Sequence, residues 1–113
     1  MDKNEDVEIK CWCNGHKRSE VHYNYNGIAE GKKTDWYESG AKKSECKYST
    51  GRITGIANTW YESGQMEFEI PFKIGAIHGV EIKWYESGKI ESKDYYEKGS
   101  PKGKLPLNYT SKK

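Results

Sequence analysis

The stretch Trp36-Tyr37-Glu38-Ser39-Gly40 recurs without change at residues 60–64 and 84–88, a spacing of 24 residues each time. Identical copies at a constant period are the signature of a tandem repeat protein, in which each unit is one supersecondary element. Two glycine series keep the same period. They are Gly27, Gly51, Gly75 and Gly99, and Gly31, Gly55, Gly79 and Gly103. The sequence therefore predicts four tandem units with two turns each.

The array is irregular at both ends. Cys11-Trp12-Cys13-Asn14-Gly15 aligns with the pentapeptide as a diverged first copy, which carries one extra residue before Gly27. At the other end, Asn108-Tyr109 stands where a fifth pentapeptide would begin. Atypical terminal units are common in repeat proteins. We expect a single domain over residues 1–113, with repeats at approximately 7–30, 31–54, 55–78 and 79–102 and a half repeat at 103–110.

The turn residues indicate β-hairpins. Ser-Gly or Asn-Gly between two strand-like runs supplies the positive φ of a tight hairpin turn, as at Ser39-Gly40 and its equivalents. The Gly-x-x-x-Gly segments then form longer second connections, which still keep sequential strands adjacent. The sequence thus predicts an all-β fold, an elongated single antiparallel meander sheet of about nine strands. Their approximate ranges are 7–13, 16–25, 31–38, 41–48, 55–62, 65–72, 79–86, 89–97 and 104–109.

Composition favours the same fold class. The chain has nine Tyr and four Trp, and large rings sit well on a pleated surface. No stretch repeats apolar residues at helical spacing. Both faces of the predicted sheet mix aromatic with charged residues, so we expect aromatic ladders between repeats to replace a conventional core. The two ladders are Trp36, Trp60 and Trp84, and Tyr37, Tyr61 and Tyr85.

Charge and hydropathy narrow the classes of partner. The 19 basic and 17 acidic residues give a net charge of +2 and do not segregate into blocks, so we expect no direct nucleic-acid binding. We interpret Lys112-Lys113 as a solvated end. Residues 1–10 are acidic and lack the apolar region of a signal peptide, and no stretch approaches the roughly 18 apolar residues of a membrane span. These features predict a cytoplasmic protein, and three unpaired cysteines fit a reducing compartment.

The candidates for catalytic and metal sites have plainer interpretations. The glutamates of the three pentapeptides form a series, but equivalent residues lie about 10 Å apart at two strand spacings. Paired carboxylates in glycoside hydrolysis need roughly 5–9.5 Å. Cys11 and Cys13 with His16 lack the fourth ligand of a structural zinc site, and the Gly-x-x-x-Gly segments offer no helix N-terminus to a phosphate. We therefore expect no catalytic residue, no metal and no cofactor, and a chain that is not an enzyme.

At these motifs the chain resembles MORN repeats of the second, bacterial type. Their pattern is an aromatic pair, a turn glycine, a strand, and Gly-x-x-x-Gly, often with His before the last glycine, as at His78-Gly79. The resemblance covers about residues 7–109 and is closest to the YwqK-like antitoxin family. The first copy departs from the pattern, with Cys11-Trp12 in place of Trp-Tyr, and the fifth is cut short. The resemblance implies a curved ribbon that binds another protein and, by the family name, a role in toxin neutralisation.

The residues themselves offer a protein-recognition face, with rigid aromatic anchors and polar groups between them. Our first hypothesis is an antitoxin or immunity-type inhibitor that masks a toxin or nuclease by direct binding. The alternatives are a phage- or mobile-element-encoded inhibitor of a host defence nuclease, and a lipid-associated MORN scaffold, which the balanced charge disfavours. The predicted partner-binding residues are Trp36, Tyr37, Glu38, Trp60, Tyr61, Glu62, Trp84, Tyr85 and Glu86.

Overall fold

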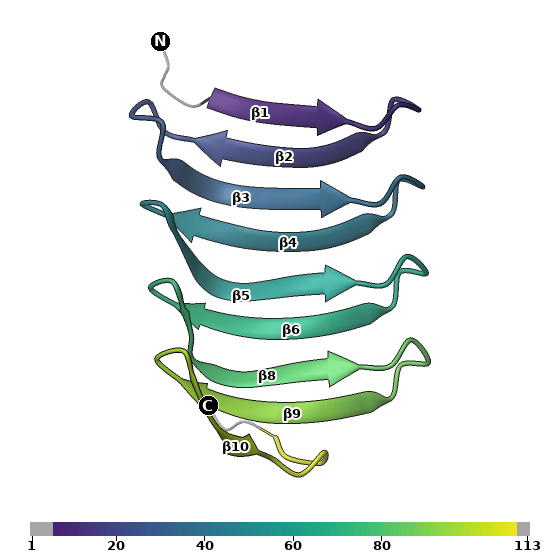
Figure 1. Ribbon diagram of the computed structural model, residues 1–113, viewed down its shortest axis with the longest axis vertical. Helices are drawn as coiled ribbons and strands as arrows, with labels where there is room; N and C mark the ends of the chain where they lie inside the picture. The colour runs from purple at the N-terminus through teal and green to yellow at the C-terminus, as the bar shows by residue number, and fades with distance from the viewer. Residues whose placement is uncertain (1–5, 111–113) are drawn as a thin grey trace.

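The computed structural model describes residues 6–110 and contains strands, turns and loops over that range (Figure 1). The predicted features at residues 1–5 and 111–113, among them Lys112-Lys113, lie outside the described residues. The strands are β1 (Asp6–Cys11), β2 (Lys17–Tyr23), β3 (Ala29–Trp36), β4 (Lys42–Ser49), β5 (Arg52–Trp60), β6 (Met66–Lys73), β7 (Ala76–Ile77), β8 (Gly79–Trp84), β9 (Ile90–Glu97) and β10 (Ser100–Lys104).

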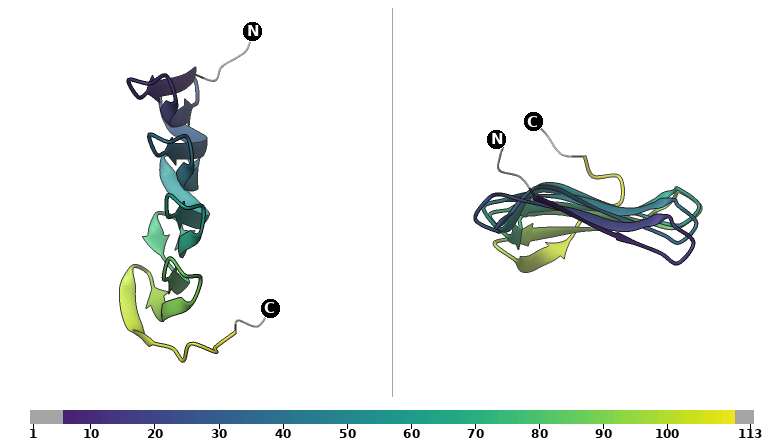
Figure 2. Two further views of the ribbon diagram at one scale, coloured as in Figure 1. Left: turned by 90° about the vertical axis from the view of Figure 1, so that its right-hand side faces the viewer. Right: turned by 90° about the horizontal axis from the view of Figure 1, so that it is seen from above.

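All ten strands form one open antiparallel sheet. Neighbours follow chain order from β1 to β6 and then through β8, β9 and β10, while the short β7 pairs with β6. The molecule measures 49 × 32 × 22 Å, and the two turned views in Figure 2 show a single layer with a gentle curve. The predicted all-β class and the elongated meander are confirmed.

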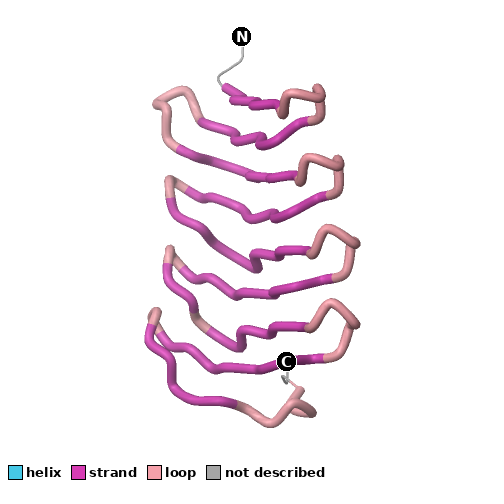
Figure 3. The backbone as a smooth tube through the Cα atoms, turned by 45° about the vertical axis from the view of Figure 1, so that its right-hand side comes forward, coloured by secondary structure: helices cyan, strands magenta, loops and turns pink. Residues whose placement is uncertain are grey.

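The connections stack along two edges of this ribbon (Figures 1 and 3). Five-residue loops at 12–16, 37–41, 61–65 and 85–89 form one edge, which we call the long-loop edge. The opposite edge, which we call the short-turn edge, contains the loop 24–28 and the two-residue turns 50–51, 74–75 and 98–99. The extra residue of the first repeat thus lengthens one connection and leaves the sheet intact.

The predicted assignment of turn types is wrong, because the tight turns lie in the Gly-x-x-x-Gly segments. A type I′ turn needs a positive φ at both central residues, and Ile74 (49°) and Gly75 (83°) meet this condition. Thr50-Gly51 and Lys98-Gly99 repeat the pattern. In a Ser-Gly loop the glycine alone has a positive φ. The chain there reverses over five residues, with a hydrogen bond of 2.8 Å from the Tyr37 N–H to the Ala41 carbonyl.

The second glycine of each Gly-x-x-x-Gly segment, where the predicted strands begin or are about to begin, lies within a strand or at its start. Gly55 has a φ of 78° and lies where the pairing of β4 with β5 shifts register. Glycine suits such a bulge because it adopts a positive φ without steric cost. On the following strand, an aromatic residue is paired with each of three of these glycines. An aromatic ring in this position can cover the backbone that a glycine, having no side chain, leaves exposed. The pairs are Gly31 with Tyr48, Gly55 with Phe72, and Gly79 with Tyr96.

Each tight turn is hydrogen-bonded to the preceding repeat. The N–H groups of Gly51, Gly75 and Gly99 donate to the carbonyls of Ala29, Ile53 and Ile77 at 2.9, 2.9 and 2.8 Å. Side chains accept the neighbouring N–H in two of the three turns. The Thr50 N–H donates to Glu30 Oε1 at 2.8 Å, and the Lys98 N–H donates to His78 Nδ1 at 3.2 Å. The short-turn edge is therefore held from repeat to repeat by main-chain donors.

The predicted last strand, 104–109, is wrong. Lys98-Gly99 reverses the chain in two residues, so β10 begins at Ser100 and ends at Lys104. Pro106 has no N–H to offer a ladder, and the Tyr109 N–H donates to the Pro106 carbonyl in a turn. Residues 105–110, which we call the C-terminal tail, leave the sheet and fold over one of its faces (Figure 2).

The sheet lacks a conventional core, as its mixed faces predicted. Within residues 6–110 no apolar side chain is fully buried, and the two buried residues are Thr34 and Lys93, each 7% exposed. A single layer cannot enclose side chains between two sheets. Stability must therefore come from contacts and hydrogen bonds along the array.

Candidate binding site

The nine predicted partner-binding residues lie together on the long-loop edge. Each Trp ends a strand, namely β3, β5 or β8, and the following Tyr and Glu open the five-residue loop. The loops stack one above another along the ribbon (Figure 3). The structure thus brings the whole predicted set to one edge, and it separates the members by exposure. The Trp side chains are half-buried, whereas Glu38, Glu62 and Glu86 are exposed.

The tyrosine ladder is built by hydrogen bonds that the sequence did not predict. The Tyr37 hydroxyl donates to the Trp60 carbonyl, and the Tyr61 hydroxyl donates to the Trp84 carbonyl, each at 2.6 Å. In the first repeat Trp12 replaces the tyrosine, and its indole N–H donates to the Trp36 carbonyl at 3.2 Å. In each of these three pairs the ring reaches the next repeat directly. The diverged first copy therefore keeps the contact with a different donor.

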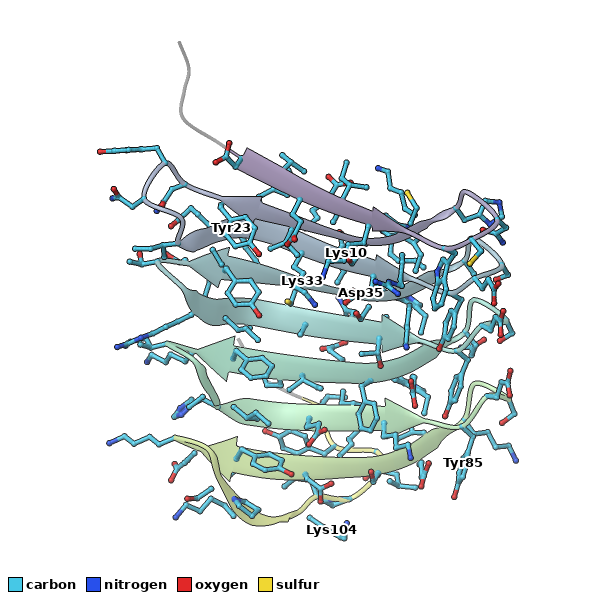
Figure 4. All side chains as sticks on the ribbon, turned by 45° about the horizontal axis from the view of Figure 1, so that its top comes forward. Lys10, Tyr23, Lys33, Asp35, Tyr85 and Lys104 are labelled. Carbon is cyan, nitrogen blue, oxygen red and sulfur yellow. The ribbon has the colours of Figure 1, made fainter. Side chains whose placement is uncertain are left out.

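Trp12, Tyr37, Tyr61 and Tyr85 occupy equivalent positions, and we call them the ring row. Tyr85 is the last member, and its hydroxyl makes no hydrogen bond within residues 6–110, because the array ends before another Trp strand end. Its side chain is 51% exposed and projects from the long-loop edge (Figure 4). Tyr37 and Tyr61 are half-buried, and desolvation raises the pKa of each phenol. Tyr85 is thus the member most open to a partner.

Basic side chains of the first two repeats lie over aromatic rings. On the ring row, Arg18 stacks on Trp12 at 5.5 Å and Lys43 stacks on Tyr37 at 5.6 Å, measured to the ring centroids. On the tryptophans, Lys17 lies 5.3 Å from the Trp36 centroid and Lys42 lies 5.5 Å from that of Trp60. Such cation–π contacts are favourable because the ring face carries partial negative charge.

The same sequence positions change character in the last two repeats. Met66-Glu67 and Ile90-Glu91 stand where Lys17-Arg18 and Lys42-Lys43 stand earlier. After desolvation, Glu67 contributes most to the raised pKa of both Tyr37 and Tyr61, because a nearby carboxylate disfavours the phenolate. The halves of the ribbon therefore differ in the residue six positions after each ring, which is a cation in the first two repeats and a carboxylate in the last two.

A second aromatic series escaped the sequence prediction. Tyr48, Phe72 and Tyr96 each face the bulge glycine of the preceding strand, and Tyr23 holds the equivalent place in the first repeat. The signal was present, since Tyr48, Phe72 and Tyr96 follow the 24-residue period. Figure 4 shows Tyr23 above Lys33 and Asp35 on this face. Lys33 pairs with Asp35 at 3.1 Å, so this part of the face has its own internal partners.

The C-terminal tail covers part of the opposite face. Lys93 Nζ donates to the Tyr109 carbonyl, and the Leu105 N–H donates to the Lys93 carbonyl at 2.8 Å. A shallow open groove remains beside the tail, lined by residues such as Ile56, Val80 and Ile82. The tail thus makes the two faces of the fourth repeat unequal.

The family model described as MORN repeat variant matches this chain twice. The matched segments are residues 53–73 and 77–98, which are the third and fourth hairpins of the ribbon. No curated protein and no solved structure matched the chain. The two matches support a repeat module of a kind that is commonly protein- or membrane-binding.

The MORN-matched hairpins include His78, the residue that the sequence pattern singled out before Gly79. Its Nδ1 accepts the Lys98 N–H of the following tight turn at 3.2 Å. His22, which lies in β2, has its Nε2 3.0 Å from Glu20 Oε2. Both histidines therefore have structural partners.

The cysteines are dispersed. Cys11 and Cys13 are exposed, and Cys46 is half-buried. The first strand ends at Cys11, so Cys13 lies in the loop and does not share the strand as predicted. Burial raises the pKa of the Cys46 thiol. Within residues 6–110 no three His, Cys, Asp or Glu side chains gather as a metal site would require.

No helix in the described part of the chain is long and apolar enough to cross a membrane.

Proposed function

We propose that this chain is a non-catalytic inhibitor of the antitoxin or immunity type, which neutralises a toxin or nuclease by direct one-to-one binding. The observation that carries the proposal is the long-loop edge, where aromatic rings and exposed glutamates recur at a fixed interval on a hydrogen-bonded ribbon. Aromatic anchors separated by polar groups suit protein recognition, and a rigid scaffold reduces the entropy lost on binding.

The face offered to the partner is centred on the exposed part of this edge. Tyr37 and Tyr61 already use their hydroxyls to hold the next repeat, so their rings are partly committed to the scaffold. Four exposed side chains make no such hydrogen bond to the next repeat, namely those of Tyr85, Glu38, Glu62 and Glu86. We therefore assign the main contacts to Tyr85 and Glu86, with Glu62 beside them.

The experiment is co-expression with the product of each neighbouring gene. We expect this chain to restore growth that a neighbouring toxin-domain protein arrests, and to form a one-to-one complex with it in isothermal titration calorimetry. Tyr85→Ala with Glu86→Lys should weaken the complex at least about tenfold. Tyr25→Ala is the matched control, because Tyr25 is 75% exposed but lies on the short-turn edge. Absence of both rescue and complex would contradict the proposal.

Two measurements separate the alternatives. An inhibitor carried by a phage or mobile element would bind a host nuclease by the same edge, and a phage gene cluster around this gene would favour it. A membrane scaffold would float with vesicles that contain anionic lipid. We expect no flotation, because exposed glutamates on the binding edge oppose an anionic surface.

A further inference from the structure

In the first half of the ring row, each ring has a basic side chain over its face. In the first two repeats the residue six positions after each ring is basic, and its charged group lies over the ring. Arg18 is 5.5 Å from the centroid of Trp12, and Lys43 is 5.6 Å from that of Tyr37. These two pairs show that this position of the repeat can hold a cation on the face of an aromatic ring.

The last two repeats keep the rings and lack the cations. Glu67 follows Tyr61 at the same distance in sequence, and Glu91 follows Tyr85. Within residues 6–110 no basic group lies over Tyr61 or Tyr85. Lys83 is the basic residue next to Trp84 on β8, but its Nζ lies 5.4 Å from the Phe68 ring centroid and 3.5 Å from Glu91 Oε1. The two ring faces are therefore without a cation of their own.

The surroundings of these rings are acidic. Glu67 carries one internal hydrogen bond, from the Thr59 hydroxyl at 3.3 Å. Glu62 and Glu86 are exposed in the adjoining loops. Carboxylates beside an aromatic face strengthen its attraction for a cation and repel phosphate. The surface thus combines the ring geometry of the first half with the opposite charge.

We propose that a segment of the partner protein rich in arginine or lysine lies along Tyr61 and Tyr85 and supplies the two missing cations. The inference rests on the proposed binding function and names the chemistry of its partner. Equivalent rings are two strands apart, about 9.6 Å. A polyproline II segment brings residues i and i+3 to the same side at about 9.3 Å. A basic residue at every third position therefore matches the two rings.

The test uses the full chain and a synthetic probe, so that it needs no identified partner. The probe is a capped heptapeptide of sequence Arg-Pro-Pro-Arg-Pro-Pro-Arg, and its counterpart has glutamate in place of arginine. Titration followed by amide chemical shifts should show binding of the arginine peptide, with the largest shifts around Tyr61, Tyr85 and Glu91. The glutamate peptide should leave the spectrum unchanged.

Charge exchange between the two halves makes the test specific. Glu67→Lys with Glu91→Lys restores the basic pattern of the first two repeats, and we expect the arginine peptide to bind about tenfold more weakly. Lys43→Glu removes the cation from Tyr37 and should tighten binding about threefold. Asp6→Lys with Glu8→Lys is the control, because it changes the net charge by the same amount on exposed positions of β1.

Equal weakening by the control pair would overturn the inference, because it would reduce the effect to net charge. Absence of peptide binding would overturn it as well. Either result would leave the proposed inhibitor function standing if growth rescue and the one-to-one complex are observed. Conversely, peptide binding that responds to the exchanges supports the inference even where no neighbouring toxin is neutralised.

Discussion

The first two repeats and the last two have the same backbone arrangement but differ in what lies over the ring row. In both halves a ring on the long-loop edge donates a hydrogen bond to the strand end of the next repeat. In both halves a tight-turn glycine donates to the repeat before it. The side chains around the rings are free to change from Arg18 and Lys43 to Glu67 and Glu91. The comparison indicates that main-chain acceptors hold the repeats in order, so surface charge can vary for recognition.

The bulge glycines offer the largest expected effect. A Cβ on Gly79 would lie 3.0 Å from Pro71 Cγ, and its φ is 123°, whereas a Cβ on Gly55 would meet nothing within 4 Å. Gly79→Ala combines backbone strain with a steric clash, and we expect it to lower the free energy of unfolding by about 2–4 kcal/mol. Gly55→Ala has the strain alone, about 1–2 kcal/mol. Urea unfolding of both variants measures the difference.

The glycine comparison has its own control in Pro71. If the extra loss in Gly79→Ala comes from the contact with this ring, adding Pro71→Ala should recover part of it. Equal losses for Gly55→Ala and Gly79→Ala would show that the fourth repeat is packed no more tightly than the third.

Removing a tyrosine hydroxyl from the ring row should have the next largest effect on the free energy of unfolding. Tyr85, the last member of the row, should differ from the others. Tyr61→Phe removes the donor to the Trp84 carbonyl, and we expect a loss of about 1–2 kcal/mol in the free energy of unfolding. Tyr37→Phe should cost the same in the first half, because its bond to Trp60 has the same length. Tyr85→Phe should change stability little, since its hydroxyl is unused. A loss at Tyr85 equal to that at Tyr61 would contradict this account.

Much of the fold could be predicted from the period alone. Three copies of one pentapeptide placed the hairpins and the antiparallel order correctly, because a repeat of fixed length must place equivalent residues in register. The aligned first copy also held, since Trp12 donates where the tyrosines donate. These features depend on the spacing of residues along the chain.

Turn types and the last strand could not be predicted, because they depend on backbone conformations that the amino-acid sequence does not reveal. Thr50 and Ile74 have a positive φ, which β-branched residues rarely adopt. Nothing in the sequence therefore indicated that Thr50-Gly51 and Ile74-Gly75 form two-residue turns. The division of the candidate site also required the structure. The identical Trp-Tyr-Glu triplets differ in exposure and in the groups above their rings, and these differences come from neighbouring strands.

The C-terminal tail marks a further difference between the halves and gives a smaller, local prediction. Position 93 is lysine where the three earlier repeats have Glu20, Glu45 and Glu69, and its Nζ holds the Tyr109 carbonyl. Lys93→Met keeps the aliphatic stem and removes the donor. We expect about 1 kcal/mol less protection for the amides of residues 105–110 in hydrogen exchange. Lys89→Met, on an exposed residue of the same repeat, is the control and should leave the tail protected.

The smallest expected effect concerns the cations over the tryptophans. Lys42→Met converts the second repeat to the residue that the third has at Met66, and it removes the stack on Trp60 together with the ion pair to Glu45 at 3.4 Å. The Lys42 side chain is 45% exposed, so solvent screens both contacts. We expect a loss of about 0.5 kcal/mol at low salt, and a smaller loss in 1 M NaCl, where the Debye length is about 3 Å. Lys47→Met, an exposed substitution on the same strand, is the control. An equal loss at both salt concentrations would show that Lys42 acts by packing its stem on the ring, and the contrast between the halves would then be one of shape and not of charge.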